Sequence, residues 1–377
     1  MKILVEDSLP YGREFFSSLG RCELFSHKTI TPELAADADI LLVRSTTKVN
    51  QALLARNTKI QYVATATAGI DHLDQGYLDE RGIAWNSAAG CNALAVAEYV
   101  VSAIYRVAQS HNWHLQDKSV GIVGAGHVGS ALAPKLEAMG LTVFLCDPPL
   151  ADAGDPRHFV DMEAIMACDI ISLHVPLVTS APYPTEHLFD AKRLAQLSEQ
   201  QLLINACRGE VIDNQALLNQ FEQGWKGKVV LDVWENEPGI ELALLPYVIF
   251  GTAHIAGHTI EGKARGTEML YQQVCQRLGK NAELSMYDFL PPVEVDVSEL
   301  IASWAGVPTQ AQMAELVFAI YDIAADSEHF MRENTDADAF RYIRKHYNIR
   351  REFSSIFLNA GNSPQLQALY GLGFARG

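Results

Sequence analysis

Three ionisable side chains follow short apolar runs in the middle of the chain, and together they could oxidise a hydroxy acid. They are Arg208, Glu237 and His254. A planar guanidinium can clamp a carboxylate with two parallel hydrogen bonds. A histidine beside a carboxylate is suited to take a hydroxyl proton while hydride leaves the carbon that bears the hydroxyl. Because ligands bind beyond the carboxyl ends of the strands in a parallel α/β sheet, we expect these side chains at one ligand site.

Each of these residues could instead have a purely structural role, and the residue types alone do not exclude that alternative. Arg208 could be a surface arginine paired with Glu210 or Asp213. A single histidine such as His254 is more often a satisfied core or loop residue, and Glu237 alone is typical of a solvated turn. Only their combination with a nucleotide-binding pattern favours chemistry.

A glycine-rich turn supplies that pattern. Gly124, Gly126 and Gly129 have G-x-G-x-x-G spacing between an apolar run and a helical stretch. The first glycine permits the tight turn, the second lets the backbone approach a pyrophosphate, and the third lets helix and strand pack closely. Asp147 ends the next apolar run, where a carboxylate binds ribose hydroxyls and repels a 2′-phosphate. The sequence therefore predicts NAD rather than NADP; the alternative is a Rossmann-like turn that binds nothing.

Apolar, β-branched runs alternate with amphipathic stretches along most of the chain, which is typical of parallel sheets covered by helices. The runs are short and continuous, as in strands buried on both faces. We predict strands over residues 3–5, 40–44, 60–64, 120–123, 142–146, 170–174, 202–206, 229–233 and 248–251. Long helices are predicted over 91–111 and 259–279. Pro134 should kink the helix after the glycine turn or mark a shorter first segment.

Composition and charge limit the partners. The chain has 377 residues, of which 49% are hydrophobic, and a formal net charge of −16. This field repels polyanions, so we expect neither nucleic acid nor a membrane surface as a partner. The six cysteines lack metal-binding spacing, and the chain starts without a charged leader or cleavage site. We therefore predict reduced thiols, no bound metal and a cytoplasmic location.

Four ordered segments resemble the D-isomer-specific 2-hydroxy-acid dehydrogenase family: VGIVGAGHVG, LINACRGEVID, LDVWENEP and GTAHIAGHT. The resemblance implies an α/β protein with a Rossmann-type doubly wound cofactor domain over 93–257. It also implies a flavodoxin-like substrate domain made of 1–92 and 258–286. One branch of the family is similar over the whole chain. By that likeness, residues 287–377 form a small C-terminal α/β dimerisation domain, and we expect a homodimer.

The resemblance implies roles for individual residues. Arg208 would bind the substrate carboxylate and polarise the reacting oxygen, His254 would be the acid/base, and Glu237 would support His254. Asp232 would contact the carboxamide side of the nicotinamide. The other cofactor contacts would come from Gly124, Gly126, His127, Val128, Gly129, Asp147, Val175, Ala206, Cys207 and Gly257. The side chains of Cys207 and His174 are expected only to pack.

The same branch oxidises 4-phospho-D-erythronate with NAD in vitamin B6 synthesis, which implies a small phosphorylated hydroxy acid as substrate. By resemblance Ser45 and Thr67 touch the substrate, as does position 258, where the family commonly has tyrosine and this chain has His258. A phosphorylated acid needs a second anion site besides Arg208. We nominate Arg44 and Lys48, which would otherwise be solvated charges at a strand end.

Two other functions stay open. Another D-2-hydroxy-acid dehydrogenase, of the glycerate or phosphoglycerate type, would use the same site. An NAD-sensing regulator could share the fold and even the site residues, as some transcriptional corepressors do. Hydride transfer to NAD separates an enzyme from a sensor.

Overall fold

The computed structural model describes residues 1–293, 297–304, 306–358 and 367–376. Contacts between residues divide the chain into two compact units. The first consists of Met1–Asn92 and Thr259–Pro292, and the second of Ala93–His258 and Val293–Gly377. Each unit is built on its own parallel sheet of five or six strands.

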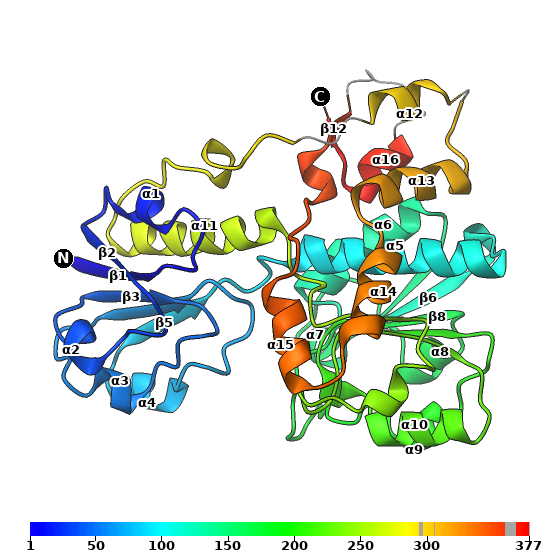
Figure 1. The fold of residues 1–377 in the computed structure, drawn as a ribbon, viewed down its shortest axis with the longest axis horizontal. Coiled ribbons are helices and arrows are strands. Elements are labelled where there is room, and N and C mark those ends of the chain that lie inside the picture. The colour runs from blue at the N-terminus through cyan, green and yellow to red at the C-terminus, as the bar shows by residue number, and fades with distance from the viewer. Residues whose placement is uncertain (294–296, 305, 359–366, 377) are drawn as a thin grey trace. The chain divides into compact units, whose positions relative to one another are not determined.

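The first unit is a five-stranded sheet between two layers of helices (Figure 1). Its elements are β1 (Lys2–Glu6), α1 (Gly12–Phe16), β2 (Arg21–Phe25), α2 (Pro32–Ala35), β3 (Ile40–Val43), α3 (Gln51–Leu54), β4 (Tyr62–Thr65), α4 (Gln75–Glu80), β5 (Ala84–Ser87), α11 (Ile260–Arg277) and the 3₁₀ helix η4 (Met286–Asp288). Helices α1 and α11 cover one face, and α2, α3 and α4 cover the other. The strand order β2-β1-β3-β4-β5 is the flavodoxin-like order that the resemblance implied.

The second unit contains a six-stranded parallel sheet. Its elements up to residue 258 are α5 (Ala93–His111), η1 (Leu115–Asp117), β6 (Ser119–Val123), α6 (His127–Ala138), β7 (Thr142–Cys146), α7 (Pro148–Asp152), α8 (Met162–Met166), β8 (Ile170–Leu173), α9 (Ala191–Leu194), β9 (Leu202–Asn205), η2 (Gly209–Val211), α10 (Asn214–Glu222), β10 (Lys228–Leu231), η3 (Leu242–Leu244) and β11 (Phe250–Gly251). The strand order is β11-β10-β9-β8-β6-β7, with α5 and α6 on one face and α8, α9 and α10 on the other. The chain reverses direction across the sheet between β7 and β8, so the β6 end lies at a switch point where ligands bind.

The described residues after 293 pack against this second sheet's helices. They form α12 (Ser298–Ala302), α13 (Gln310–Ile320), α14 (Ile323–Glu333), α15 (Ala337–Lys345), η5 (Phe353–Ser355), β12 (Phe357–Leu358), α16 (Gln367–Leu372) and β13 (Ala375–Arg376). Helices α13 and α14 lie against α5, and α16 lies against α6. The Ser102 hydroxyl of α5 donates to the Tyr321 carbonyl at 3.0 Å, and Arg106 of α5 pairs with Asp322. A dimerisation role for this segment stays a prediction.

The predicted strands are all present, with ends shifted by no more than two residues. The expectation of a shortened first segment at Pro134 is wrong, because α6 runs unbroken from His127 to Ala138. Helix α6 packs along both α5 and α16. That tertiary packing carries the helix past the hydrogen bond that proline cannot donate.

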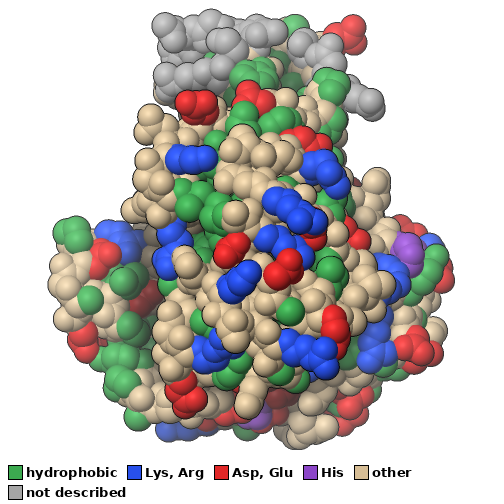
Figure 2. All heavy atoms as spheres, turned by 90° about the vertical axis from the view of Figure 1, so that its left-hand side faces the viewer, with side chains coloured by type: hydrophobic (Ala, Val, Ile, Leu, Met, Phe, Trp, Pro, Cys, Tyr) green, Lys and Arg blue, Asp and Glu red, His purple; other side chains and the backbone are tan. Residues whose placement is uncertain are grey.

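Charge is mixed rather than segregated on the face drawn in Figure 2, where Lys and Arg side chains alternate with Asp and Glu side chains. Within the described ranges, no helix is long and apolar enough to cross a membrane.

Candidate active site

The carboxyl ends of β9, β10 and β11 lie side by side, because these strands are neighbours in the second sheet. Arg208 follows β9, Glu237 follows β10, and His254 follows β11. Pairing continues past the strands, since the Asp232 amide donates to the Asn205 carbonyl at 3.0 Å. The three predicted side chains therefore start from one edge of one sheet.

Arg208 is half-buried, and its Nη1 donates to the carbonyl of its neighbour Cys207 at 2.7 Å. None of the ion pairs among the described residues involves this guanidinium. Asp213, one of the partners considered for it, faces His187 instead. The arginine thus keeps donors that can turn to a carboxylate ligand.

Gly209 explains how the end of β9 comes close to the β10 turn. A Cβ at this position would overlap the backbone carbonyl of Trp234. Only glycine permits so close an approach of two backbones. The arginine and the glycine that follow β9 therefore have separate roles: a ligand contact of Arg208 stays a prediction, whereas Gly209 lets the strand end meet the turn that carries Glu237.

His254 and Glu237 form a direct pair. Nδ1 of the imidazole lies 2.7 Å from Oε2 of Glu237, whose Oε1 accepts a hydrogen bond from the Trp234 amide at 2.9 Å. The carboxylate is thus fixed by the backbone of its own turn and in turn orients the ring. With Nδ1–H directed at the carboxylate, Nε2 is the atom left to accept a proton.

The backbone around His254 is held in an uncommon conformation. Its φ is 56°, in the left-handed region, which a non-glycine residue adopts only when its surroundings impose it. The amide of His254 donates to the Asp232 carbonyl at 2.7 Å. The amides of Ile255 and Ala256 donate to the two carboxylate oxygens of Asp232 at 2.7 and 3.0 Å. Asp232, only 1% exposed, therefore anchors this loop; its contact with the nicotinamide stays a prediction.

The glycine turn has the geometry that a dinucleotide requires. Gly124 has φ 94°, and a Cβ there would clash with the His174 carbonyl. A Cβ at Gly129 would overlap the Gly124 carbonyl, whereas one at Gly126 would meet nothing within 4 Å. The tight turn, the close helix packing and an open backbone for a pyrophosphate are thus all present, so the residues fit NAD.

Asp147 is fixed to the glycine turn. Its Oδ2 accepts a hydrogen bond from the Ala125 amide at 2.8 Å, and its Oδ1 caps α7. Arg157, which no sequence pattern predicted, also contacts this turn: its Nη1 donates to the Ala125 carbonyl at 2.9 Å and to Ser130 Oγ at 2.8 Å. Hydrogen bonds from Arg157 lower the pKa of Asp155 to about 2. No short motif links Arg157 to a turn so far upstream.

The other residues predicted to contact the cofactor lie at ends of strands and helices. His127 and Val128 begin α6, Val175 follows β8, Ala206 and Cys207 follow β9, and Gly257 follows β11. Burial lowers the pKa of His174 to about 3 and raises that of the Cys207 thiol to about 11. Both side chains are uncharged near neutral pH, which agrees with packing. The cofactor contacts themselves stay predictions.

In the first unit, a buried glutamate organises the turn after β3. Glu6 is fully buried, and its carboxylate accepts hydrogen bonds from the Arg44 amide at 2.9 Å and from the hydroxyls of Ser8, Thr46 and Thr47, each at 2.6 Å. Burial alone would raise the pKa of Glu6, but these hydrogen bonds outweigh it and lower the pKa. The turn presents exposed Ser45 and Lys48.

Thr67 follows the neighbouring strand β4, so the two predicted substrate-binding turns of the first unit share one sheet edge. The Thr67 hydroxyl donates to the Gly69 carbonyl at 2.8 Å and lies 2.8 Å from the Thr65 hydroxyl. His258 ends the second unit, where its amide donates to the Ile255 carbonyl at 2.8 Å. Substrate contacts by Ser45, Thr67 and His258 stay predictions.

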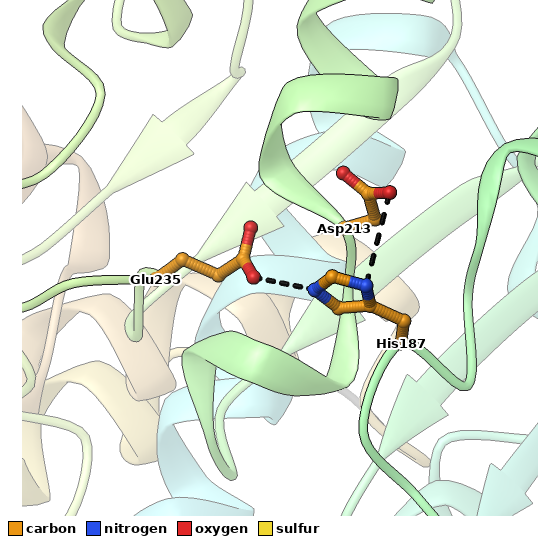
Figure 3. A group of neighbouring side chains, drawn as sticks. All are labelled: His187, Asp213 and Glu235. Atoms are coloured by element: carbon orange, nitrogen blue, oxygen red, sulfur yellow. Dashed lines mark hydrogen bonds and ion pairs between the residues drawn. The ribbon is translucent and has the colours of Figure 1, made fainter.

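A second titratable cluster lies near the Glu237 turn (Figure 3). The His187 ring lies between two carboxylates: Nε2 is 2.6 Å from Glu235 Oε1, and Nδ1 is 3.8 Å from Asp213 Oδ2. Among the described residues this is the one group with metal-ligand types close together. Because the carboxylates lie at opposite ring nitrogens and Glu235 also accepts from the Asn214 amide, we interpret it as an ion-pair cluster.

Comparison with known proteins identifies two family models. Residues 93–256 match the model described as D-isomer specific 2-hydroxyacid dehydrogenase, NAD binding domain, and residues 289–373 match a domain of unknown function. The erythronate-4-phosphate dehydrogenase of Pseudoalteromonas atlantica is 60% identical, over 100% of both chains. The protein of that name from Psychromonas ingrahamii is 44% identical, over 100% of this chain and 97% of its own.

Solved structures show the same fold at lower identity. The NAD⁺-bound 3-phosphoglycerate dehydrogenase of Entamoeba histolytica is 23% identical, with a TM-score of 0.62 over 75% of this chain and 97% of its own. The D-lactate dehydrogenase of Aquifex aeolicus, complexed with NAD and lactic acid, is 22% identical, with a TM-score of 0.58 over 74% of this chain and 95% of its own. These likenesses support the fold alone.

Proposed function

Because this chain belongs to the family of erythronate-4-phosphate dehydrogenases, we propose that it oxidises the C2 hydroxyl of 4-phospho-D-erythronate with NAD. The product is (R)-3-hydroxy-2-oxo-4-phosphooxybutanoate, and the reaction belongs to pyridoxine biosynthesis. The full-length identity of 60% carries the choice of substrate. The pairing of His254 with Glu237 supports the choice of reaction.

Arg208 and His254 divide the work at the reacting carbon. The guanidinium of Arg208 binds the carboxylate and polarises the C2 oxygen. Nε2 of His254 removes the hydroxyl proton, and Glu237 stabilises the imidazolium that forms. The glycine turn and Asp147 would hold NAD, which would supply the acceptor for the hydride that leaves C2. The reverse reaction returns the proton from the same nitrogen.

We assign the substrate phosphate to Arg44 and Lys48, and further contacts to Ser45, Thr67 and His258. The Glu6 carboxylate supports this assignment, since it fixes the turn that carries the first two residues. An imidazole at position 258 can donate a hydrogen bond, as the hydroxyl of the family's tyrosine would.

The test is NAD reduction by the full-length protein, followed by the absorbance of the reduced nicotinamide. We expect reduction with 4-phospho-D-erythronate, and much less with erythronate, glycerate or 3-phosphoglycerate. His254→Asn is the matched control, because asparagine tolerates a left-handed backbone and cannot act as a base. Its kcat should fall about 10²- to 10⁴-fold while NAD still binds. If none of these hydroxy acids reduces NAD, the proposed function is wrong.

We also propose that the enzyme is a cytoplasmic homodimer joined through residues 287–377. The exposed apolar side chains of Val307 and Phe357 in this segment support this, together with a family model that matches the segment separately. Sedimentation equilibrium of the full chain would give the mass of two chains; a single-chain mass would contradict the proposal.

A further inference from the structure

Arg350 is a buried cation whose hydrogen bonds reach the backbone of the loop after His254. Its side chain lies in the segment between α15 and η5, and the residue is 8% exposed. Nη2 donates to the carbonyl of Ala256 at 2.6 Å and to that of Ala95, at the start of α5, at 2.8 Å. Nη1 lies 3.3 Å from the carbonyl of Ile255. A guanidinium stays charged in a protein, so burying it here requires these carbonyls.

The backbone amides of the same loop residues are bound by a buried carboxylate. The amides of Ile255 and Ala256 donate to the Asp232 carboxylate, while their carbonyls face Arg350. A buried carboxylate and a buried guanidinium thus grip the same stretch of backbone. Hydrogen bonds to charged groups are the stronger ones, so this double grip fixes the peptide planes next to His254.

Aromatic side chains also connect Arg350 with Asp232. The Arg350 guanidinium lies 4.0 Å from the ring centroid of Tyr321, which stacks on Tyr99. The Tyr99 hydroxyl lies 2.7 Å from Thr252 Oγ1, which donates to Asp232 at 2.7 Å. The contacts of Arg350 with this network are therefore specific in direction and not a general filling of space.

Packing and polar contacts both hold this loop, since Ala253, Ile255 and Ala256 are at most 2% exposed. A cavity of about 220 Å³ is lined by Thr252, Ala253 and Ile255 on one side and by residues of α14 and α15 on the other. The left-handed backbone of His254 needs surroundings that impose it. The polar contacts from Asp232 and Arg350 supply that constraint.

We propose that Arg350 is a positioning residue for His254, contributed by the segment that follows the NAD-binding domain. Arg350 acts through the carbonyls of Ile255 and Ala256. The proposal rests on the proposed role of His254 as proton acceptor. The added C-terminal segment then has a part in the chemistry of its own chain.

Arg350→Met in the full-length protein tests this proposal, with Asp322→Asn as matched control. Asp322 pairs with Arg106 and so ties the same segment to α5, but it does not touch the loop; asparagine keeps its capping of α14. We expect Arg350→Met to lower kcat about 10- to 100-fold, as small misplacements of a catalytic group do. Asp322→Asn should leave kcat unchanged even if it lowers the melting temperature. Equal losses of kcat in both variants would overturn the proposal.

A pH profile of kcat/KM separates positioning from general loss of structure. In Arg350→Met the acidic limb should move, because the geometry of the His254–Glu237 pair changes; a folded variant with wild-type kcat and profile overturns the proposal. If Arg350→Met fails to fold, Arg350→Lys decides. One ammonium cannot span carbonyls of two segments, so kcat should fall several-fold, and an unchanged kcat contradicts the role. His254→Asn is measured alongside: if it keeps the wild-type kcat, the role of His254 on which this proposal rests is wrong, whereas the proposed function fails only if the wild type does not reduce NAD.

Discussion

The Asp147 carboxylate accepts a hydrogen bond from the Ala125 amide at 2.8 Å, so the acidic end of β7 and the glycine turn after β6 are fixed to each other. Arg157 contacts the carbonyl of the same residue, Ala125. The charge of this arginine is paired, because its Nε and Nη2 donate to the two carboxylate oxygens of Asp155 at 2.8 Å. Asp147 is therefore the residue that we expect to set the balance between NAD and NADP.

Replacing Asp147 tests this balance. Asp147→Ser keeps a helix-capping oxygen for α7 and removes the charge. We expect kcat/KM for NAD to fall about 10- to 100-fold, the cost of losing a charged hydrogen-bond acceptor, and NADP to become a usable cofactor. Asp161→Ser, at the cap of α8, is the control and should change neither value. Unchanged cofactor preference in Asp147→Ser would contradict the role.

Glu237→Gln should lower kcat about 10²-fold or more with little change in KM. The amide can still accept from Nδ1–H of His254, but it no longer stabilises the imidazolium that forms when the hydroxyl proton is removed. Steady-state kinetics with saturating NAD measure both constants. Glu222→Gln, an exposed change on α10, serves as control. A Glu237→Gln variant with wild-type kcat would remove Glu237 from the mechanism.

Arg44→Ala should harm oxidation of 4-phospho-D-erythronate far more than oxidation of erythronate. Losing a charge-assisted contact to the phosphate should lower kcat/KM about 10- to 100-fold for the phosphorylated acid only. Arg56→Ala, which removes an exposed arginine paired with Glu33 in the same unit, is the control. Equal losses for both substrates would exclude Arg44 from the phosphate site.

The His187 cluster should stabilise the fold only toward acidic pH. The hydrogen bond with Glu235 raises the pKa of His187. The stabilisation is therefore full below the ordinary histidine pKa of about 6.5 and is lost as pH rises through the higher folded value. His187→Asn suits the left-handed φ of 46°.

Because the His187 side chain is 43% exposed, we expect its pairing to contribute less than about 1 kcal/mol to the free energy of unfolding. Urea midpoints of wild type and His187→Asn should differ near pH 6 and converge near pH 9. His27→Asn, at an exposed histidine, should show no such trend. A gap that persists at alkaline pH would mean that the pair contributes by packing instead of charge.

Continuous apolar strands were the predictable part of the fold. β3 and β9 are buried along their whole length, and their sequences are unbroken apolar runs apart from the closing Asn205. β2 and β5 were missed because they are edge strands, half exposed, with polar side chains such as Arg21, Glu23 and Asn86. An edge strand needs only one buried face, so its composition resembles that of a loop.

The site residues also divide into those that the sequence could predict and those that it could not. Arg208, Glu237 and His254 could be nominated because strand ends in parallel sheets form sites, and each lies close in sequence to its strand. Glu6, which serves the turn at residue 44, and Arg350, which grips residues 255 and 256, act on segments far away along the chain. No local pattern marks such residues, since only the folded chain brings donor and acceptor together.

Gly209 couples two segments that are separate in the sequence, the end of β9 and the turn after β10. Any substituent there would push the Trp234 peptide away, and with it the turn whose amide steadies Glu237. The strand end that carries Arg208 and the turn that carries Glu237 therefore cannot shift independently of each other. Even one methyl group at residue 209 would require both segments to move together.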